Sequence, residues 1–302
     1  MASVLVTGGA GFIGSHLAAA LLARGDQVRV LDNFSSGLRT HLPAEVELIE
    51  GDVQDPIAVT KAVAGIETIF HQAAFISVPE SIENPAACWA SNIDGTLALL
   101  AAAQQAGCRG AVLASSAAVY GDSQALPLAE DAPAKCLSPY AASKYFNETL
   151  AQLYTLTYNL PVTALRYFNV YGPRQSPNSA YAAAVPKFIA ALAAGQAPTV
   201  FGDGRQGRDF VFVGDVVRAN LLAAEANAGG VYNVCTGQET TLLDLLAALY
   251  PLFPNAPQAV HAASRLGDVP RSLGDPRAAE AALGFRAQTS LADGLRQIVE
   301  AM

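Results

Sequence analysis

The sequence predicts an α/β fold: a doubly wound parallel sheet followed by a smaller α/β lobe. Two observations predict it. Short β-branched segments alternate with Ala- and Leu-rich segments through the first two-thirds of the chain. Most of the strand segments are apolar nearly throughout, as expected of strands that are buried on both faces. Strict alternation of strand and helix places helices on both faces of a parallel sheet.

The expected elements of this larger part follow in order. We expect strands at residues 3–7, 27–32, 45–50, 68–71, 110–115 and 162–167. We expect helices at residues 15–24, 56–64, 85–106 and 138–158. Together they predict a nucleotide-binding domain over residues 1–169, to which some later segments return.

The alternation loosens after residue 169, where a smaller substrate-binding lobe is expected over residues 170–302. Residues 171–180 are rich in Pro, Asn and Ser and are expected to form an ordered loop at the site. Shorter elements follow: helices at 182–194, 215–226 and 242–250, and a strand at 210–213. Because no low-complexity linker separates the two parts, we expect an extensive interface with the ligand between them.

Composition excludes several classes of function. The 302-residue chain has a formal charge of −8 and no Lys/Arg block, which argues against a nucleic-acid partner. Its four cysteines and four histidines are dispersed without a CxxC pair, so we expect neither a disulfide framework nor a metal. No apolar run reaches membrane-spanning length, and the first strand leaves no room for a signal peptide. We expect a cytoplasmic, reduced, soluble protein.

A glycine-rich segment joins the first strand to the first helix, with the glycines spaced GxxGxxG at Gly8, Gly11 and Gly14. Small residues allow a tight turn and let backbone N–H groups approach a pyrophosphate at the helix N-terminus. Glycines also mark ordinary turns, but the strand before and the helix after favour a Rossmann-type dinucleotide site.

Acidic residues end the second and third strands. Asp32 stands where a carboxylate accepts hydrogen bonds from the adenosine ribose, which favours NAD over NADP; the alternative is a turn with Asn33. Asp52 and Val53 either hold the adenine edge or, through Asp52, cap the next helix.

The segment 138–144 contains YxxxK, formed by Tyr140 and Lys144. Residues four apart share one face of a helix, so the lysine can favour the phenolate. The fifth strand ends in Ser115 and Ser116, which places a hydroxyl where it can contact a substrate oxygen. A serine pair at a strand end followed by YxxxK on the next helix is much more specific than YxxxK alone.

The chain resembles the extended short-chain dehydrogenase/reductase family, and within it the UDP-hexose 4-epimerases. The resemblance covers essentially the whole length. It depends on Asp32 and on the segments TGGAGFIGSHL, HQAA (71–74), ASSAAVYGD (114–122), SPYAASK, LRYFNVYGPRQ (165–175), RDFVFV (208–213) and VYNVCTG (231–237).

The resemblance implies a role for each matching residue. Tyr140 is the general base, Lys144 tunes it and contacts the nicotinamide ribose, and Ser116 hydrogen-bonds the reacting oxygen. C4 of the sugar passes hydride to NAD, the 4-keto intermediate turns over, and hydride returns to its other face. The implied NAD contacts are Gly8, Gly11, Phe12, Ile13, Gly14, Asp32, Asn33, Asp52, Val53, Gln72, Ala73, Ala74, Ser115, Tyr140, Lys144 and Tyr167.

The substrate must be held firmly by its nucleotide and loosely by its sugar. The expected contacts are Ser77, Ser116, Tyr140, Asn169, Arg208, Arg265, Asp268 and Ser272. Arginines suit a diphosphate through bidentate contacts. The alternative for each is a solvated surface residue, which applies more to Arg265 than to Arg208, because RDFVFV matches the family's pattern. The alternative for Asn169 is a turn after the sixth strand. Related dehydratases carry an acidic pair where this chain has Ala117 and Ala118, which disfavours dehydration and decarboxylation.

By rough alignment, Ile76, Ala183 and Ser272 line the hexose, and the small Ser272 leaves room for a 2-acetamido group. We therefore expect UDP-N-acetylglucosamine/galactosamine as substrates, together with UDP-glucose/galactose. The alternatives are a uronate 4-epimerase or decarboxylase, for which Arg174 is the candidate cation, and a non-catalytic NAD-binding regulator. The family commonly dimerises through two helices, here 85–106 and 138–158. Leu97, Leu100, Leu150 and Leu153 either form that seam or face their own sheet.

Overall fold

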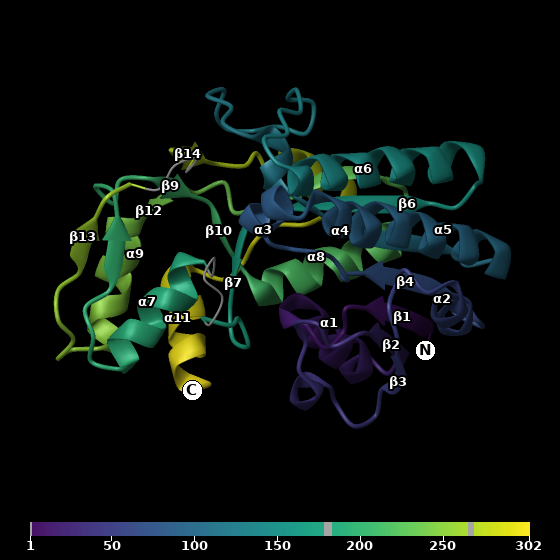
Figure 1. The fold of residues 1–302 in the computed structure, drawn as a ribbon, viewed down its shortest axis with the longest axis horizontal. Helices are drawn as coiled ribbons and strands as arrows, with labels where there is room; N and C mark the ends of the chain where they lie inside the picture. Colours follow the sequence, from purple (N-terminus) through teal and green to yellow (C-terminus); the bar gives the residue numbers. More distant parts are fainter. Residues whose placement is uncertain (1, 178–182, 265–268) are drawn as a thin grey trace.

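The computed structural model describes residues 2–177, 183–264 and 269–302 (Figure 1). Its main sheet has seven strands in the order β11-β6-β5-β4-β1-β2-β3, and every neighbouring pair is parallel. The strands are β1 (Ser3–Thr7), β2 (Gln27–Asp32), β3 (Glu47–Glu50), β4 (Thr68–His71), β5 (Gly110–Ser116), β6 (Val162–Tyr167) and β11 (Gly230–Val234).

Helices cover both faces of this sheet, which confirms the predicted doubly wound fold (Figure 1). Alternate side chains of one strand enter different cores: Leu5 packs in one cluster, Val4 and Val6 in the other. The first cluster lies under α2 (Pro56–Val63), α5 (Gly95–Ala106) and α6 (Pro139–Thr157). The second lies under α1 (Phe12–Ala23), α8 (Val213–Ala226) and α10 (Arg277–Leu283).

The strand β11 was not among the expected strands. It follows β6 by some sixty residues and pairs with it in register, with Val231 opposite Ala164. The segment includes Gly230 and Asn233, so its composition does not distinguish it from a loop. Together with α8 and α10, β11 returns the chain to the larger sheet after the smaller lobe has begun.

The expected helix over residues 85–106 is interrupted. The structure has α4 (Pro85–Trp89), a π-helical turn η2 (Ala90–Asp94) and then α5. Within η2 the Asn92 side chain accepts from Phe75 N at 2.7 Å and donates to Phe75 O at 3.1 Å. A π-turn holds an extra residue, and such turns often lie at functional sites. Here it ties the helix to the segment that follows β4.

The smaller lobe contains three short sheets and three helices among its described residues. β7 (Asn169–Tyr171) pairs with β10 (Phe210–Phe212), and β8 (Thr199–Phe201) with β13 (Val260–Ala262). β9 (Gly207–Arg208) lies between β12 (Thr240–Thr241) and β14 (Arg271–Ser272). A separate apolar core joins these sheets to α7 (Ala184–Ala193), α9 (Leu242–Leu249) and α11 (Leu291–Glu300). The remaining elements are α3 (Val78–Glu83), η1 (Arg39–His41), η3 (Ala117–Tyr120) and η4 (Tyr250–Leu252).

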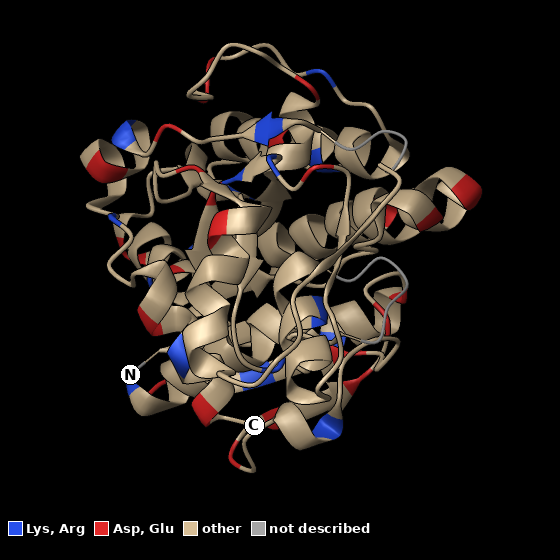
Figure 2. Ribbon diagram, turned by 90° about the vertical axis from the view of Figure 1, so that its left-hand side faces the viewer, with Lys and Arg blue, Asp and Glu red and all other residues tan. Residues whose placement is uncertain are grey.

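Charges are interspersed rather than grouped by sign on the side of the molecule seen in Figure 2. In the part of the chain that the structure describes, no helix is long and apolar enough to cross a membrane. The same residues contain no group of three or more His, Cys, Asp or Glu side chains placed to hold a metal ion.

Candidate active site

A cleft runs over the carboxyl ends of the main strands, the edge at which such sheets bind ligands. It has about 980 Å³ of free space. One end is formed by the β1–α1 turn and the end of β2, the other by the end of β5 and the start of α6. The lining includes Gly8, Gly11, Phe12, Ile13, Gly14, Asp32, Asn33, Asp52, Val53, Gln72, Ala73, Ala74, Ser115, Tyr140, Lys144 and Tyr167. The structure thus brings together all sixteen positions proposed as NAD contacts.

The glycines of the β1–α1 turn are required by close approach. Gly8 has φ +66°, and a Cβ there would lie 2.6 Å from the backbone nitrogen of Ala73. A Cβ on Gly14 would lie 2.1 Å from the carbonyl oxygen of Gly8. No side chain caps α1 at Gly11, so the N–H groups of the first turn face the cleft without a side-chain acceptor. This cradle fits the pyrophosphate of a dinucleotide.

Asp32 and Asp52 have structural ties besides lining the cleft. Asp32 Oδ2 accepts from Ala10 N and Oδ1 from Phe34 N, each at 2.8 Å. Asp32 therefore also stabilises the turn with Asn33, which is the alternative role expected for it. Asn33 donates to Asp52 at 2.7 Å. The cap of α2 is Asp55, so the capping alternative for Asp52 is wrong.

Tyr140 and Lys144 lie one turn apart on α6, at the end of the cleft nearest β5. Lys144 Nζ donates to the Ala114 carbonyl at 2.8 Å and lies 5.9 Å from the centre of the Tyr140 ring. Ser116 accepts from Ala118 N at 3.1 Å, and its hydroxyl lies close enough to the Tyr140 phenol to lower the pKa of that phenol. The three expected catalytic residues therefore converge.

Burial dominates the acid–base properties of this group. It raises the pKa of the Tyr140 phenol, and the hydrogen bond from Ser116 opposes that rise. Burial lowers the pKa of Lys144 to about 8. Among the protein's own groups, burial thus favours the protonated form of the Tyr140 phenol. An adjacent positive charge would lower the phenol's pKa, and oxidised nicotinamide carries one.

Tyr167, the last residue of β6, lines the first cleft. Its hydroxyl hydrogen-bonds Gln72 at 3.1 Å and accepts from Asn220 Nδ2 at 2.8 Å. Burial raises the pKa of Tyr167 to about 12, which keeps the phenol neutral. Residues from β4, β6 and α8 are fixed together here, so Gln72 and Tyr167 present a defined surface to a ligand.

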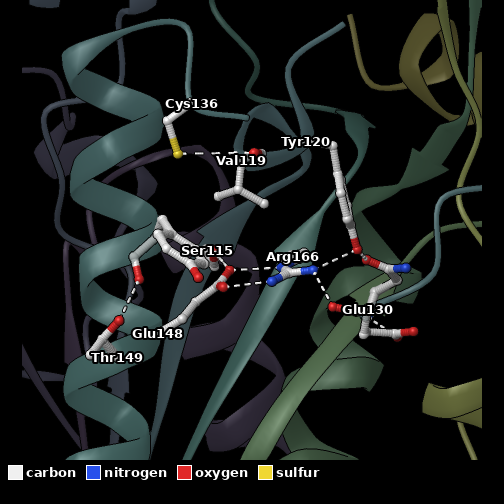
Figure 3. Close-up of polar contacts among 10 residues, drawn as sticks. Ser115, Val119, Tyr120, Glu130, Cys136, Glu148, Thr149 and Arg166 are labelled. Atoms are coloured by element: carbon white, nitrogen blue, oxygen red, sulfur yellow. Dashed lines mark hydrogen bonds and ion pairs between the residues drawn. The ribbon is translucent and has the colours of Figure 1, made fainter. Parts of the chain in front are cut away.

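Ser115 lines the cleft, but its hydroxyl points elsewhere. It donates to Glu148 Oε1 at 2.5 Å within a buried polar network (Figure 3). The Ser115 hydroxyl therefore has no hydrogen left to donate to a cofactor in this arrangement. Ala117 and Ala118 follow Ser116 in η3, so no carboxylate occupies these two positions.

A second cleft, with about 1500 Å³ of free space, lies in the smaller lobe. Two of the residues expected to hold the nucleotide line it: Asn169 on β7 and Arg208 on β9. Asn169 is a strand residue paired with Phe210, not the turn residue of the alternative interpretation. The rest of the lining is largely apolar with a few polar groups, as in most small-molecule sites.

The other predicted substrate contacts are scattered. Ser77 caps α3, accepting from Glu80 N at 3.3 Å. Ile76 lines the first cleft, whereas Ala183 lines the second. Ser272 lies outside both linings, but it pairs with Arg208 across β14 and β9. Arg265 and Asp268 fall outside the described residues.

Arg174, the candidate cation for a sugar carboxylate, lies outside both clefts. It donates to the carbonyl oxygen of His41 at 3.4 Å and has φ +66°. This position gives no support to recognition of a uronate.

Several lining residues were not foreseen. Ser35 and Ser36 follow Asp32 and Asn33 after one intervening residue, Phe34, and this proximity in the chain was a usable signal. Ser91 faces the first cleft from the π-turn, which no periodicity reveals. In the second cleft the unforeseen residues include Lys187, Phe188, Gln196, Thr199, Phe201, Gln206 and Leu242.

A model of the NAD dependent epimerase/dehydratase family matches residues 4–235. A curated relative, UDP-glucose 4-epimerase of Mycolicibacterium smegmatis, is 40% identical over 305 residues, covering 98% of this chain and 97% of the relative. Among solved structures, UDP-N-acetylglucosamine 4-epimerase from Methanobrevibacter ruminantium M1, in complex with UDP-N-acetylmuramic acid, is 36% identical with a TM-score of 0.96. The match covers 99% of this chain and 97% of that one. The complex of Thermus thermophilus UDP-glucose 4-epimerase with NAD is 38% identical with a TM-score of 0.91, covering 99% and 98%.

Proposed function

The chain belongs to the NAD dependent epimerase/dehydratase family, and within it we propose that this enzyme is a UDP-hexose 4-epimerase that accepts UDP-N-acetylhexosamines as well as UDP-glucose and UDP-galactose. One observation carries the proposal. Tyr140 and Lys144 line the end of the first cleft with Ser116 beside Tyr140, while the two positions after Ser116 are alanines. A catalytic base is present, but those positions hold no carboxylate to expel a hydroxyl.

NAD is the cofactor of this family, and the glycine cradle and the sixteen lining positions fit it. When bound, NAD supplies the reversible hydride acceptor for C4 of the sugar. The first-turn N–H groups of α1 would hold the pyrophosphate, and Asp32 would exclude a 2′-phosphate. Tyr140 and Lys144 line the other end of the cleft, where the nicotinamide would lie.

The chain's own groups move one proton. The Ser116 hydroxyl orients O4 of the sugar, and Tyr140 accepts the O4 proton as C4 is oxidised. After the 4-keto sugar has turned over, hydride would return to the opposite face of C4, and Tyr140 returns the proton to O4. Because the cycle ends where it began, the enzyme needs no external oxidant or reductant.

Turning over requires a firm hold on one part of the substrate only. Asn169 and Arg208 line the second cleft, where an arginine and an amide suit a nucleoside diphosphate. The two residues that follow Ser116 are alanines, so these positions add no bulky side chain next to the catalytic serine. This asymmetry lets the nucleotide stay fixed while the sugar rotates.

The test is incubation with UDP-N-acetylglucosamine, UDP-glucose and UDP-glucuronate in separate reactions, with the products resolved by NMR. We expect C4 epimers from the first two and none from the third. Tyr140→Phe retains bound NAD and loses roughly a hundredfold to ten-thousandfold in kcat. Epimerisation or decarboxylation of UDP-glucuronate alone favours the uronate alternative. Absence of turnover with retained NAD favours a binding protein.

We also propose a homodimer formed through α5 and α6. Leu97 and Leu153 are each 44% exposed, whereas Leu100 and Leu150 are buried in the chain's own core. Of the four leucines considered for the dimer interface, only Leu97 and Leu153 are therefore available to it. Trp89, Tyr145, Phe146 and Leu156 extend the exposed apolar surface along these helices. Residence in the cytoplasm stays a prediction.

A further inference from the structure

A buried ion pair lies beside the catalytic group and is unused by the chemistry above. Glu148 of α6 and Arg166 of β6 are each 4% exposed. Arg166 Nε and Nη2 donate to Glu148 Oε1 and Oε2 at 2.8 and 2.7 Å (Figure 3). Removing two charges from water is costly, and apolar side chains of similar volume often serve stability as well. The pair therefore invites an explanation other than stability.

One end of the pair holds the strand that carries Ser116. Ser115 donates its hydroxyl to Glu148 Oε1 at 2.5 Å, and Lys144 donates to the Ala114 carbonyl at 2.8 Å. Lys144 and Glu148, which lie one turn apart on α6, thus fix the successive β5 residues Ala114 and Ser115 to that helix. Ser116 follows Ser115 directly at the end of β5, so fixing Ser115 also fixes the backbone from which the Ser116 side chain projects.

The other end holds the chain that leads from Ser116 to Tyr140. Arg166 Nη1 donates to the Tyr120 hydroxyl at 2.7 Å and to the Glu130 carbonyl at 3.0 Å. Tyr120 lies in η3, just after Ser116, and Glu130 lies in the loop before α6. One guanidinium therefore contacts both segments between the two catalytic residues (Figure 3).

We propose that the Glu148–Arg166 pair positions the Ser116 hydroxyl against the Tyr140 phenol. Both are positioning residues, since neither lines the cleft that would hold the reacting groups. The inference rests on the proposed function, which gives Ser116 and Tyr140 their catalytic meaning. The geometry of the network stands independently of which sugar is turned over.

The contact between Ser116 and Tyr140 has a measurable signature. Burial raises the pKa of Tyr140, and the Ser116 hydrogen bond lowers it. The other titratable groups that face the phenol are Cys88 of α4, whose charge would raise the pKa further, and Lys144 on α6 itself. Weakening the Ser116 contact while leaving Cys88 and Lys144 in place must therefore raise the Tyr140 pKa.

Ser115→Ala is the sharpest test, because it removes one hydroxyl and leaves the ion pair intact. In the NAD-loaded enzyme, Tyr140 ionisation is followed by phenolate absorbance, with Tyr140→Phe as the blank. We expect the midpoint to rise by roughly half a pH unit or more. We expect kcat to fall about tenfold with KM within about twofold, as misplacement of a catalytic group predicts.

A second variant separates positioning from stability. Glu148→Leu with Arg166→Met replaces the pair by apolar side chains, and we expect its thermal midpoint to stay near that of the wild type. It should show the same rise in the Tyr140 midpoint. The matched control is Arg24→Met with Asp26→Leu, an ion pair at the far end of α1, which should leave the titration unchanged.

A wild-type Tyr140 titration in Ser115→Ala overturns the positioning role, even if kcat changes. Failure of the wild type to epimerise any UDP-sugar overturns the proposed function instead. The titration still decides the positioning role in that case, because it needs only bound NAD.

Discussion

Lys144 lies 5.9 Å from the centre of the Tyr140 ring, yet its ammonium donates to the backbone of Ala114 at 2.8 Å. The lysine is thus held by the catalytic strand instead of by a carboxylate. Its side chain is buried, and burial lowers its pKa to about 8. A carbonyl oxygen stabilises an ammonium less than a full negative charge does, so desolvation prevails.

We predict that Lys144 in the cofactor-free protein loses its charge as pH rises through about 8. An ordinary lysine does so near pH 10.4. The chain has four lysines, Lys61, Lys135, Lys144 and Lys187, so ¹³C NMR of labelled lysine side chains can resolve each titration. The signal lost in Lys144→Met identifies the residue. A midpoint above 10 for that signal would contradict the prediction.

Acid should destabilise the fold through His71. Its ring nitrogens bond Thr7 at 2.6 Å and Thr96 at 2.9 Å, and burial, aided by the charge of Lys144, lowers its pKa to about 3. Between pH 6.5 and 3 the unfolded chain therefore binds a proton that the folded chain does not. Stability is lost as pH falls through this window, by about 1.4 kcal/mol per pH unit.

Urea unfolding at pH 6.5 and pH 5 measures this effect. Compared with His71→Gln, the wild type should lose about 2 kcal/mol more of its free energy of unfolding over that interval. Carboxylates titrate in both proteins, so their contributions to the change in the free energy of unfolding cancel in the comparison. Equal losses in the two proteins would show that His71 becomes protonated in the folded state.

The larger sheet and its cleft could be predicted because their signals are local. The glycine spacing from Gly8 to Gly14 and the YxxxK pattern each indicate a function within one short segment. The second cleft could not, because Lys187, Phe201 and Leu242 come from three elements that only the folded smaller lobe brings together. The π-turn at Asn92 does not interrupt the helical spacing of apolar residues, so the sequence did not indicate it. The composition of β11, with Gly230 and Asn233, is not typical of a strand.

Dimerisation should fail when the exposed faces of α5 and α6 are charged. Leu97→Glu with Leu153→Glu places a carboxylate at two positions where the leucine side chain is 44% exposed. The fold of the subunit should tolerate these charges, whereas an apolar interface should not. Sedimentation should show a dimer for the wild type and a monomer for this variant. Ile57→Glu is the control, since Ile57 is 81% exposed on α2. A dimeric double variant would place the interface elsewhere.

Sugar choice should depend on Ser272. This residue pairs with Arg208, which lines the second cleft, and we propose that its small side chain leaves room for the 2-acetamido group. Ser272→Tyr fills that space, so kcat/KM for UDP-N-acetylhexosamines should fall roughly tenfold or more while the plain hexoses change little. Thr240→Tyr adds the same bulk on the opposite side of Arg208 and should not discriminate between the sugars. Equal losses on both classes in Ser272→Tyr would mean that the residue supports the lobe and does not select the acetamido group.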